Sequence, residues 1–99
     1  MKKIVVLNDG DNVATSLEAL EVGAEVNLTV GDEVLAITIK DAVPFGHKIA
    51  IRAMTAGENV TKYGEIIGRA SADITVGEWV HTHNVESARA RGDLVADAS

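Results

Sequence analysis

The sequence predicts a mostly β domain of many short strands, with at most one short helix. Polar and apolar residues alternate over short runs, and turn clusters rich in Gly, Asn and Asp interrupt these runs at close intervals. The 99 residues, 46% apolar and 24% charged, suffice for one domain with its own core. Such a chain is typical of a compact barrel or a folded-hairpin architecture.

The N-terminal segment begins with a predicted buried strand. Residues 3–7 are mostly β-branched, and residues 8–12 form a turn cluster. Over residues 13–20 apolar side chains recur at helical spacing, with Asn12 as a candidate N-cap. We therefore predict one short helix directly after the first turn.

The middle of the chain predicts a β-hairpin. Residues 25–30 and 33–39 both alternate with period two, and the Gly31-Asp32 turn separates them. The single proline, Pro44, stiffens the loop that follows. Later strands are predicted at residues 48–52, 66–70 and 78–84.

Residues 1–85 are expected to form one domain, and residues 86–99 a flexible C-terminal tail or the stub of a connection. A second domain is not expected at this length. The absence of cysteine excludes disulfides and thiolate catalysis, in keeping with a reducing compartment.

Charge and hydropathy restrict the partners and the compartment. The net charge is −6 and the Lys and Arg residues form no cluster, which argues against nucleic acid and anionic membrane surfaces as partners. No stretch approaches the roughly 20 apolar residues of a membrane span. The start of the chain turns polar too soon for a secretory signal, so we expect a cytoplasmic protein.

Functional side chains concentrate in residues 46–84. This block holds all three histidines, the only tyrosine and the only tryptophan. Within it a Thr-x-Gly-Glu-x-Val phrase occurs at residues 55–60 and again at 75–80. Each glycine is expected to make a turn with positive φ from which a strand begins, and each copy delivers a polar cluster.

His81 and His83 form a His-x-His pattern in a predicted strand. Both imidazoles would then lie on one face, about 6 to 7 Å apart, from where they can converge on one metal ion. The alternative is a solvated strand edge. Because Trp79 would share that face, aromatic packing beside polar side chains also stays open.

Three other groups are candidates for chemistry. Lys62-Tyr63-Gly64 combines an ammonium, a phenol and a turn, which suits carboxylate binding and acid–base work. His47 lies at the start of a strand and is either a functional group or a hydrogen-bonded strand-end residue. The cluster of Asp9, Asp11 and Asn12 has cation-binding oxygens, although turn capping explains it better.

Four motifs in register resemble the SAF domain of the altronate/galactarate dehydratase family, which reads GHK, KYG, IG-x-A and GEHVHxHN. The resemblance covers roughly residues 3–84, and Trp79 stands where the family often has histidine. The motifs here are Gly46-His47-Lys48, Lys62-Tyr63-Gly64, Ile67-Gly68-Arg69-Ala70 and Gly77-Glu78-Trp79-Val80-His81-Thr82-His83-Asn84.

The resemblance implies a β-clip fold and a lyase. In this family a much larger catalytic domain eliminates a group from a sugar acid with the help of a divalent metal, here expected to be Fe²⁺ or Mn²⁺. The chain is then a separately encoded small subunit of an altronate dehydratase-like hydro-lyase, inactive without its large partner. Two alternatives stay open: the alpha subunit of a sulfolactate sulfo-lyase, and a non-catalytic module that binds sugar acids.

The resemblance and the residue types together assign roles within the site. The substrate is expected to be a small anionic sugar acid, and the sequence leaves the oligomeric state open. We assign catalysis to His47, Lys62 and Tyr63, substrate binding to Lys48, Gly64 and Asn84, and metal binding, shared with the partner, to His81 and His83.

Overall fold

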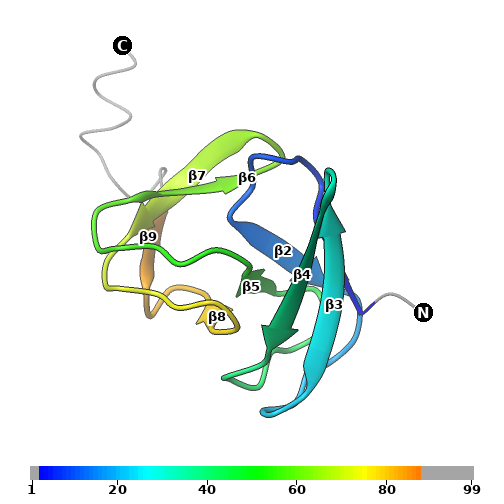
Figure 1. Cartoon of the computed structure of the whole chain (residues 1–99). Helices are drawn as coiled ribbons and strands as arrows, with labels where there is room; N and C mark the ends of the chain where they lie inside the picture. The colour runs from blue at the N-terminus through cyan, green and yellow to red at the C-terminus, as the bar shows by residue number, and fades with distance from the viewer. Residues whose placement is uncertain (1–2, 88–99) are drawn as a thin grey trace.

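The computed structural model describes residues 3–87, and within that range every regular element is a β-strand (Figure 1). The mostly β prediction is therefore confirmed. Since residues 3–87 contain no helix, none in this range could cross a membrane.

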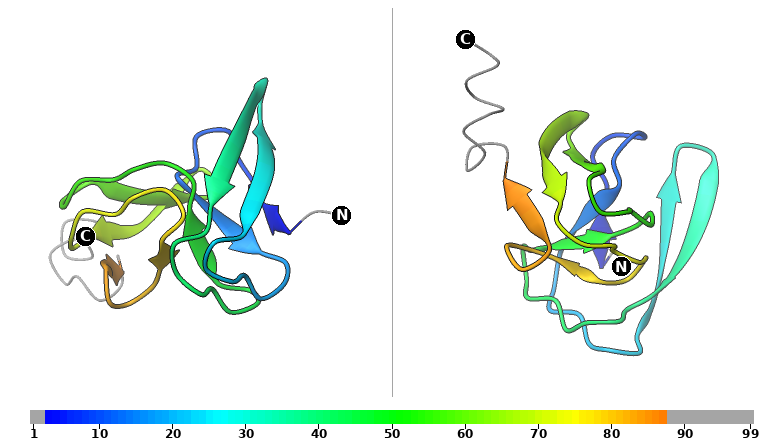
Figure 2. Two further views of the ribbon diagram at one scale, coloured as in Figure 1. Left: turned by 60° about the horizontal axis from the view of Figure 1, so that its bottom comes forward. Right: turned by 90° about the vertical axis from the view of Figure 1, so that its left-hand side faces the viewer.

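Four short strands form an antiparallel central sheet in the order β1-β2-β5-β8. A hairpin, β3–β4, lies on one side of it, and a three-stranded sheet, β6-β7-β9, lies on the other (Figures 1 and 2). The central sheet consists of β1 (Ile4–Val5), β2 (Val13–Ser16), β5 (Lys48–Ala50) and β8 (Trp79–Val80). The flanking strands are β3 (Glu25–Val30), β4 (Glu33–Thr38), β6 (Asn59–Lys62), β7 (Glu65–Ala70) and β9 (Val85–Ser87).

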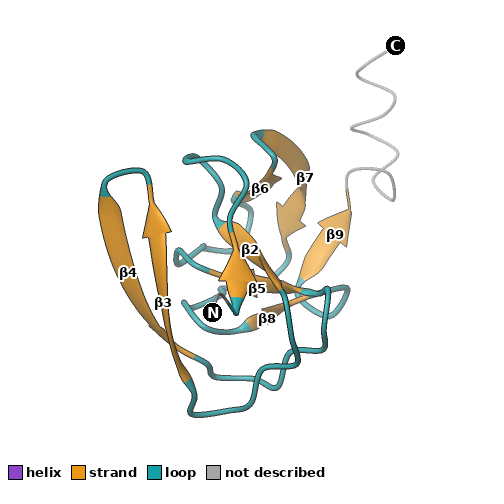
Figure 3. Ribbon diagram, turned by 90° about the vertical axis from the view of Figure 1, so that its right-hand side faces the viewer, coloured by secondary structure: helices purple, strands orange, loops and turns teal. Residues whose placement is uncertain are grey.

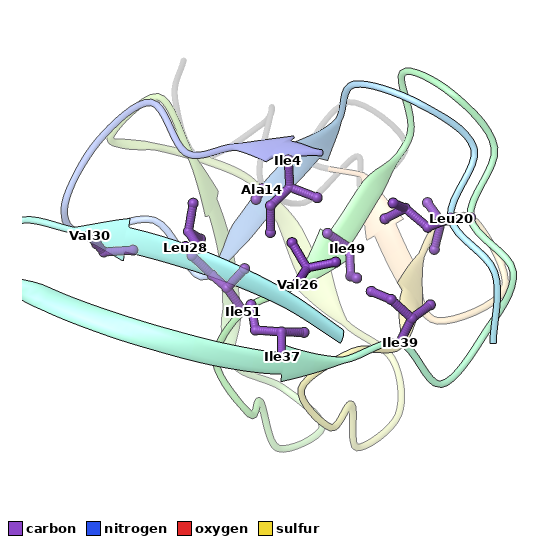
Figure 4. Packing of buried hydrophobic residues seen from close by; sticks show 11 residues of the cluster. Ile4, Ala14, Leu20, Val26, Leu28, Val30, Ile37, Ile39, Ile49 and Ile51 are labelled. Atoms are coloured by element: carbon purple, nitrogen blue, oxygen red, sulfur yellow. The ribbon is translucent and has the colours of Figure 1, made fainter. Parts of the chain in front are cut away.

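The central sheet is covered on both faces, so its strands contribute to two cores. Successive residues of a strand point to opposite faces. Ala14 and Ile49 accordingly belong to the core under the β3–β4 hairpin, where side chains from both hairpin strands meet those of β5 (Figure 4). Val13 and Ala50 belong to a second core, under the three-stranded sheet. Burial on both faces holds the two outer layers on one scaffold.

The Thr-x-Gly-Glu-x-Val repeat is confirmed as a structural unit. Gly57 and Gly77 both have φ of 95°, and β6 and β8 begin two residues later. In the second copy, the Glu78 carboxylate accepts hydrogen bonds of 2.6 Å from both the amide and the hydroxyl of Thr75. These bonds lower the pKa of Glu78, and the carboxylate therefore stays charged while it closes the turn before β8.

The same turn occurs twice more, without the Thr and Glu of the repeat. Gly23 and Gly46 also have positive φ and also precede a strand by two residues. Each of the four turns follows a residue in an isolated antiparallel bridge, which joins the units in pairs. The bridges are Leu20 with Val43 and Met54 with Ile74.

The short helix predicted over residues 13–20 is wrong. Val13–Ser16 is strand β2, which pairs with β1 on one side and β5 on the other. The helical spacing fails because neighbouring Val13 and Ala14 are both buried, in different cores, which is the signature of a central strand. Asn12 does not cap a helix; its side chain bonds Asn59 and Thr61 and fastens β6 to β2.

The other predicted elements differ mainly in length. The 25–39 hairpin is confirmed, with Val30 opposite Glu33 across a two-residue turn, while β5 is shorter than predicted (Figure 3). Residues 86 and 87, which the sequence assigned to the tail, end strand β9 and pair with β7. The rest of the predicted tail, residues 88–99, lies outside the described residues.

Candidate functional site

Three histidines gather around Trp79 beside strands β5 and β8. The ring centroid of His81 lies 5.0 Å from that of Trp79 with the planes 8° apart, so the two rings are stacked. His47 lies 5.0 Å from His81 and 5.6 Å from Trp79, and His83 lies 5.3 Å from Trp79. We call His47, Trp79, His81 and His83 the imidazole cluster.

His81 and His83 are not on a strand, which corrects the predicted strand over residues 78–84. Strand β8 ends at Val80, and the chain turns so that the amides of Asn84 and Val85 both donate to the carbonyl of His81. The two imidazoles are therefore placed by a turn and by Trp79, and not by the two-residue repeat of a strand. Both rings still contact the same indole.

Asn84 shapes this turn from within. Its side-chain oxygen accepts from the amide of His81 at 2.9 Å, and its side-chain nitrogen donates to the carbonyl of Trp79 at 2.8 Å. Asn84 is only 6% exposed. With both ends of its amide bonded to backbone, Asn84 holds the turn, and its assignment to substrate binding stays a prediction.

His47 is held in place by Ser16, a residue that the sequence reading did not select. The buried Ser16 hydroxyl donates to the carbonyl of Pro44 at 2.7 Å and accepts from the amide of His47 at 3.1 Å. Backbone bonds from Ser16 to His47 and from Gly46 to Ser16 complete the connection. The loop that presents His47 is thus fixed to β2.

A shallow hollow of about 540 Å³ lies beside the cluster, lined by Asp41, Ala42, Trp79, His81, Thr82 and His83. Asp41 is a second residue that the sequence reading missed. Its carboxylate accepts from the amide of Trp79 at 3.0 Å, so it fixes the backbone that carries the indole. The hollow has room for a small ligand and is open on one side.

The electrostatics of the site favour neutral imidazole at His81. Burial, and next the nearby His47, Lys48 and His83, lower the pKa of His81. The pKa of Lys48 is lowered first by burial and then by the positive charge of Lys62. Groups that can carry positive charge therefore lie near one another around β5, and each disfavours the charged form of the others.

Lys62 and Tyr63 lie at the turn between β6 and β7, and a buried carboxylate organises that turn. Asp11, 1% exposed, accepts from the amides of Tyr63 and Gly64 at 2.9 Å each. The ammonium of Lys62 stands 5.0 Å from the centre of the Tyr63 ring. Asp11 thus caps a distant turn, which extends the turn-capping interpretation made for it.

The structure joins most of the assigned residues, in two groups. His47, His81 and His83 form the imidazole cluster, and Lys48 follows His47 directly in the chain. Lys62 and Tyr63 form the second group, linked to the first by the charge of Lys62 acting on Lys48.

Tyr63 occupies a backbone conformation that tyrosine disfavours. Its φ is 59° and that of Gly64 is 73°, as in a type I′ hairpin turn, which prefers Asn-Gly. A residue other than Gly in this left-handed region costs about 1–2 kcal/mol, and the cost is smaller for Asn. The exposed phenol at this strained position stays a candidate for a functional role.

We expect Tyr63→Asn to raise the free energy of unfolding by about 0.5–1 kcal/mol. The substitution relieves backbone strain and removes the exposed cation–π contact with Lys62. Relief of strain is the larger effect, since that contact is worth only about 0.5–1 kcal/mol. Urea unfolding measures the change. The control, Tyr63→Ala, keeps the strain and loses the ring contact, so it should be less stable than the parent; a stabilised alanine variant would contradict this account.

The described residues do not by themselves make a complete metal centre. No group of three or more His, Cys, Asp or Glu side chains within residues 3–87 is arranged to hold an ion. His81 and His83 offer two imidazoles, whereas a protein site for a divalent transition metal takes three or more protein ligands. Such an ion would need further ligands from outside this range.

The domain is a small clip of antiparallel sheets that presents histidines at a turn beside an open hollow. The chain belongs to the altronate/galactarate dehydratase SAF domain family, whose sequence profile matches residues 2–88. The family resemblance drawn from the four motifs is confirmed.

Relatives of two kinds share this domain. The chain is 34% identical over 87 residues to an altronate dehydratase of Bacillus subtilis and 42% identical over 77 residues to that of Escherichia coli. These matches cover 88% and 78% of the chain but only 17% and 15% of the dehydratases. It is 40% identical over 88 residues to the (2R)-sulfolactate sulfo-lyase subunit alpha of Chromohalobacter salexigens, covering 85% of the chain and 94% of that subunit.

Proposed function

We propose that the chain is the small subunit of a sugar-acid dehydratase of the altronate dehydratase type, which acts with a separately encoded large subunit. The observation that carries this proposal is the open imidazole cluster, which brings three histidines together at Trp79, although the described residues contain no group of three or more side chains arranged to hold a metal ion. The dehydratases to which the chain is similar have the rest of their length, more than four-fifths, outside this match.

The proposed reaction is the loss of water from a hydroxy acid. A proton leaves the carbon next to the carboxylate, the hydroxyl on the following carbon departs as water, and the resulting enol becomes a 2-keto-3-deoxy acid. Tyr63 and Lys62 are the candidate acid–base groups on this chain. The open hollow beside Trp79 is where the substrate would meet the large subunit.

We propose that His81 and His83 are two imidazole ligands of an Fe²⁺ or Mn²⁺ site that the large subunit completes. Such an ion, bound to the carboxylate and the α-hydroxyl of a substrate, would acidify the proton that leaves. The lowered pKa of His81 keeps its imidazole neutral, the form in which it can be a ligand. With only two ligands, the separate chain should bind the metal weakly.

The experiment is to co-express the chain with a large dehydratase-like subunit from the same genome, co-purify the two, and screen acidic sugars for 2-keto acid formation. Activity with altronate or galactarate in the complex, and none with either subunit alone, is the expected result. Turnover by the rigorously purified small chain would contradict the proposal, and so would a complex that converts no acidic sugar.

A second candidate is the alpha subunit of a sulfolactate sulfo-lyase. The match that spans 94% of such a subunit favours it, because that relative is little longer than this domain. Here sulfite would leave in place of hydroxide. Sulfite release from sulfolactate by the same complex, without conversion of altronate, would select this reading.

We place the activity in the cytoplasm, where soluble sugar acids are metabolised. The lack of cysteine agrees with a reducing compartment. Fractionation of cells that produce the complex would test this, since activity in an extracellular fraction would contradict it.

If co-expression gives neither a complex nor a product, the remaining alternative is a non-catalytic module that binds sugar acids.

A further inference from the structure

His47 occupies a position that the two Thr-x-Gly-Glu-x-Val turns give to glutamate. In the first of those turns the Glu58 carboxylate accepts from the amide of Thr55 at 3.0 Å. In the second, Glu78 accepts from the amide of Thr75 at 2.6 Å. His47 follows the glycine of its own turn in the same way, and its amide bonds the carbonyl three residues back, as theirs do.

The side chain of His47 is not needed to close its turn. The residue in the threonine position is Pro44, which has no N–H to donate. Ser16 of β2 closes this turn instead, because its hydroxyl donates to the carbonyl of Pro44 and accepts from the amide of His47. The imidazole is therefore free of the turn, and its ring centroid lies 5.6 Å from that of Trp79.

Trp79 fixes the site of protonation on the His47 ring. The indole Nε1–H donates to Nδ1 of His47 at 3.3 Å, and an indole nitrogen can only donate. Nδ1 is therefore the acceptor, and in the neutral ring the proton resides on Nε2. While the indole bond is kept, such a ring has no free lone pair with which to take a proton from a substrate or to bind a metal ion.

The Nε2–H of His47 stays open to a ligand. Nε2 makes no hydrogen bond within residues 3–87. In that range the buried polar side-chain atoms without a partner are Oγ1 of Thr15 and Nε of Arg69, so Nε2 of His47 is in contact with solvent. The His47 ring lies 5.0 Å from that of His81, which lines the open hollow. His47 thus supplies a hydrogen-bond donor beside the hollow.

We propose that His47 is a neutral hydrogen-bond donor, through Nε2–H, to an oxygen of the bound hydroxy acid, and that Trp79 is the positioning residue that fixes this tautomer. His47 is then neither a general base nor a third metal ligand beside His81 and His83. In the proposed elimination, negative charge grows on the carboxylate oxygens as the neighbouring proton leaves, and a donor placed there stabilises that charge. The hydroxy acid as acceptor rests on the proposed function, whereas the tautomer and its dependence on Trp79 do not.

The first test is nitrogen-15 NMR of the imidazoles in the folded 99-residue chain, at a pH at which the rings are neutral. We expect His47 to be protonated on Nε2 in the parent chain. Trp79→Phe keeps an aromatic ring against which His81 can stack but removes the indole N–H. Part of the His47 population should then change to the Nδ1–H form. The matched control, Tyr63→Phe, changes an aromatic ring outside the cluster and should leave the tautomer unchanged.

Two outcomes of these spectra would overturn the proposal. One is a His47 ring protonated on Nδ1 in the parent chain, and the other is an unchanged tautomer in folded Trp79→Phe. If Trp79→Phe does not fold, as judged by its circular dichroism, the parent spectrum decides alone. A proton on Nε2 of His47 together with a hydrogen-bonded shift of the indole N–H supports the proposal, and the absence of either one overturns it.

The second test uses the assembled complex. His47→Ala should lower turnover by about a hundredfold or more, as the loss of one such donor does. His47→Gln supplies an N–H donor but no base, so it should recover about tenfold or more of that loss. Equal losses in the two variants would indicate a base or a ligand and overturn the donor role. A parent complex without turnover would count against the proposed function alone, because the spectra still decide the tautomer.

Discussion

Gly77→Ala is expected to lower the free energy of unfolding by about 2–5 kcal/mol. Gly77 has a φ of 95°, where a side chain costs about 1–2 kcal/mol. A β-carbon there would also collide with the backbone carbonyl oxygen of Thr38, at the end of β4. Forcing backbone segments apart in a packed region costs about 1–3 kcal/mol more.

The other copy of the repeat supplies the control. Gly57 has the same φ of 95°, but a β-carbon there would meet nothing within 4 Å. Gly57→Ala should therefore show only the conformational cost, about 1–2 kcal/mol. Urea unfolding of the two variants, followed by circular dichroism, compares them directly. Equal losses would show that the approach of Thr38 to Gly77 contributes nothing.

The fold could be predicted where the signal is local. The 25–39 hairpin follows from alternation and a Gly-Asp turn, and both repeat glycines adopt the expected positive φ. The helix over residues 13–20 failed because a strand buried on both faces does not alternate. Val13 and Ala14 are apolar for two different cores. The apparent helical spacing joins Val13 to exposed Leu17 and to Leu20, both of which lie beyond the end of β2.

The residue types of the site could be predicted, but much of its geometry could not. The block at residues 46–84 contains the imidazole cluster, as its composition suggested. The turn at His81 depends on the hydrogen bonds of the Asn84 side chain to the backbone, and the periodicity of the sequence does not reveal such bonds. Ser16 bonds His47, 31 positions away, and Asp11 bonds the amides of Tyr63 and Gly64, 52 and 53 positions away. A single sequence carries no signal for such distant pairs.

The double variant His81→Ala, His83→Ala should abolish the activity of the assembled lyase, a loss of at least about a hundredfold. The two imidazoles flank the hollow that we propose the large subunit completes, and alanine offers no ligand or donor in their place. His83 is exposed, so its loss should change stability by no more than about 0.5 kcal/mol. Loss of the stacked His81 ring from Trp79 should lower the stability only slightly.

The predicted losses of activity and stability are therefore different in size, which separates a functional role from a structural one. Asn27→Ala, which removes an exposed polar side chain from β3, is the control and should keep both activity and fold. Turnover of the complex, its metal content and the thermal unfolding of the small chain are measured for each variant. A double variant that folds, assembles and gives a complex that turns over at the parent rate would show that His81 and His83 are solvated turn residues that only pack against Trp79. That result would also exclude the shared metal site.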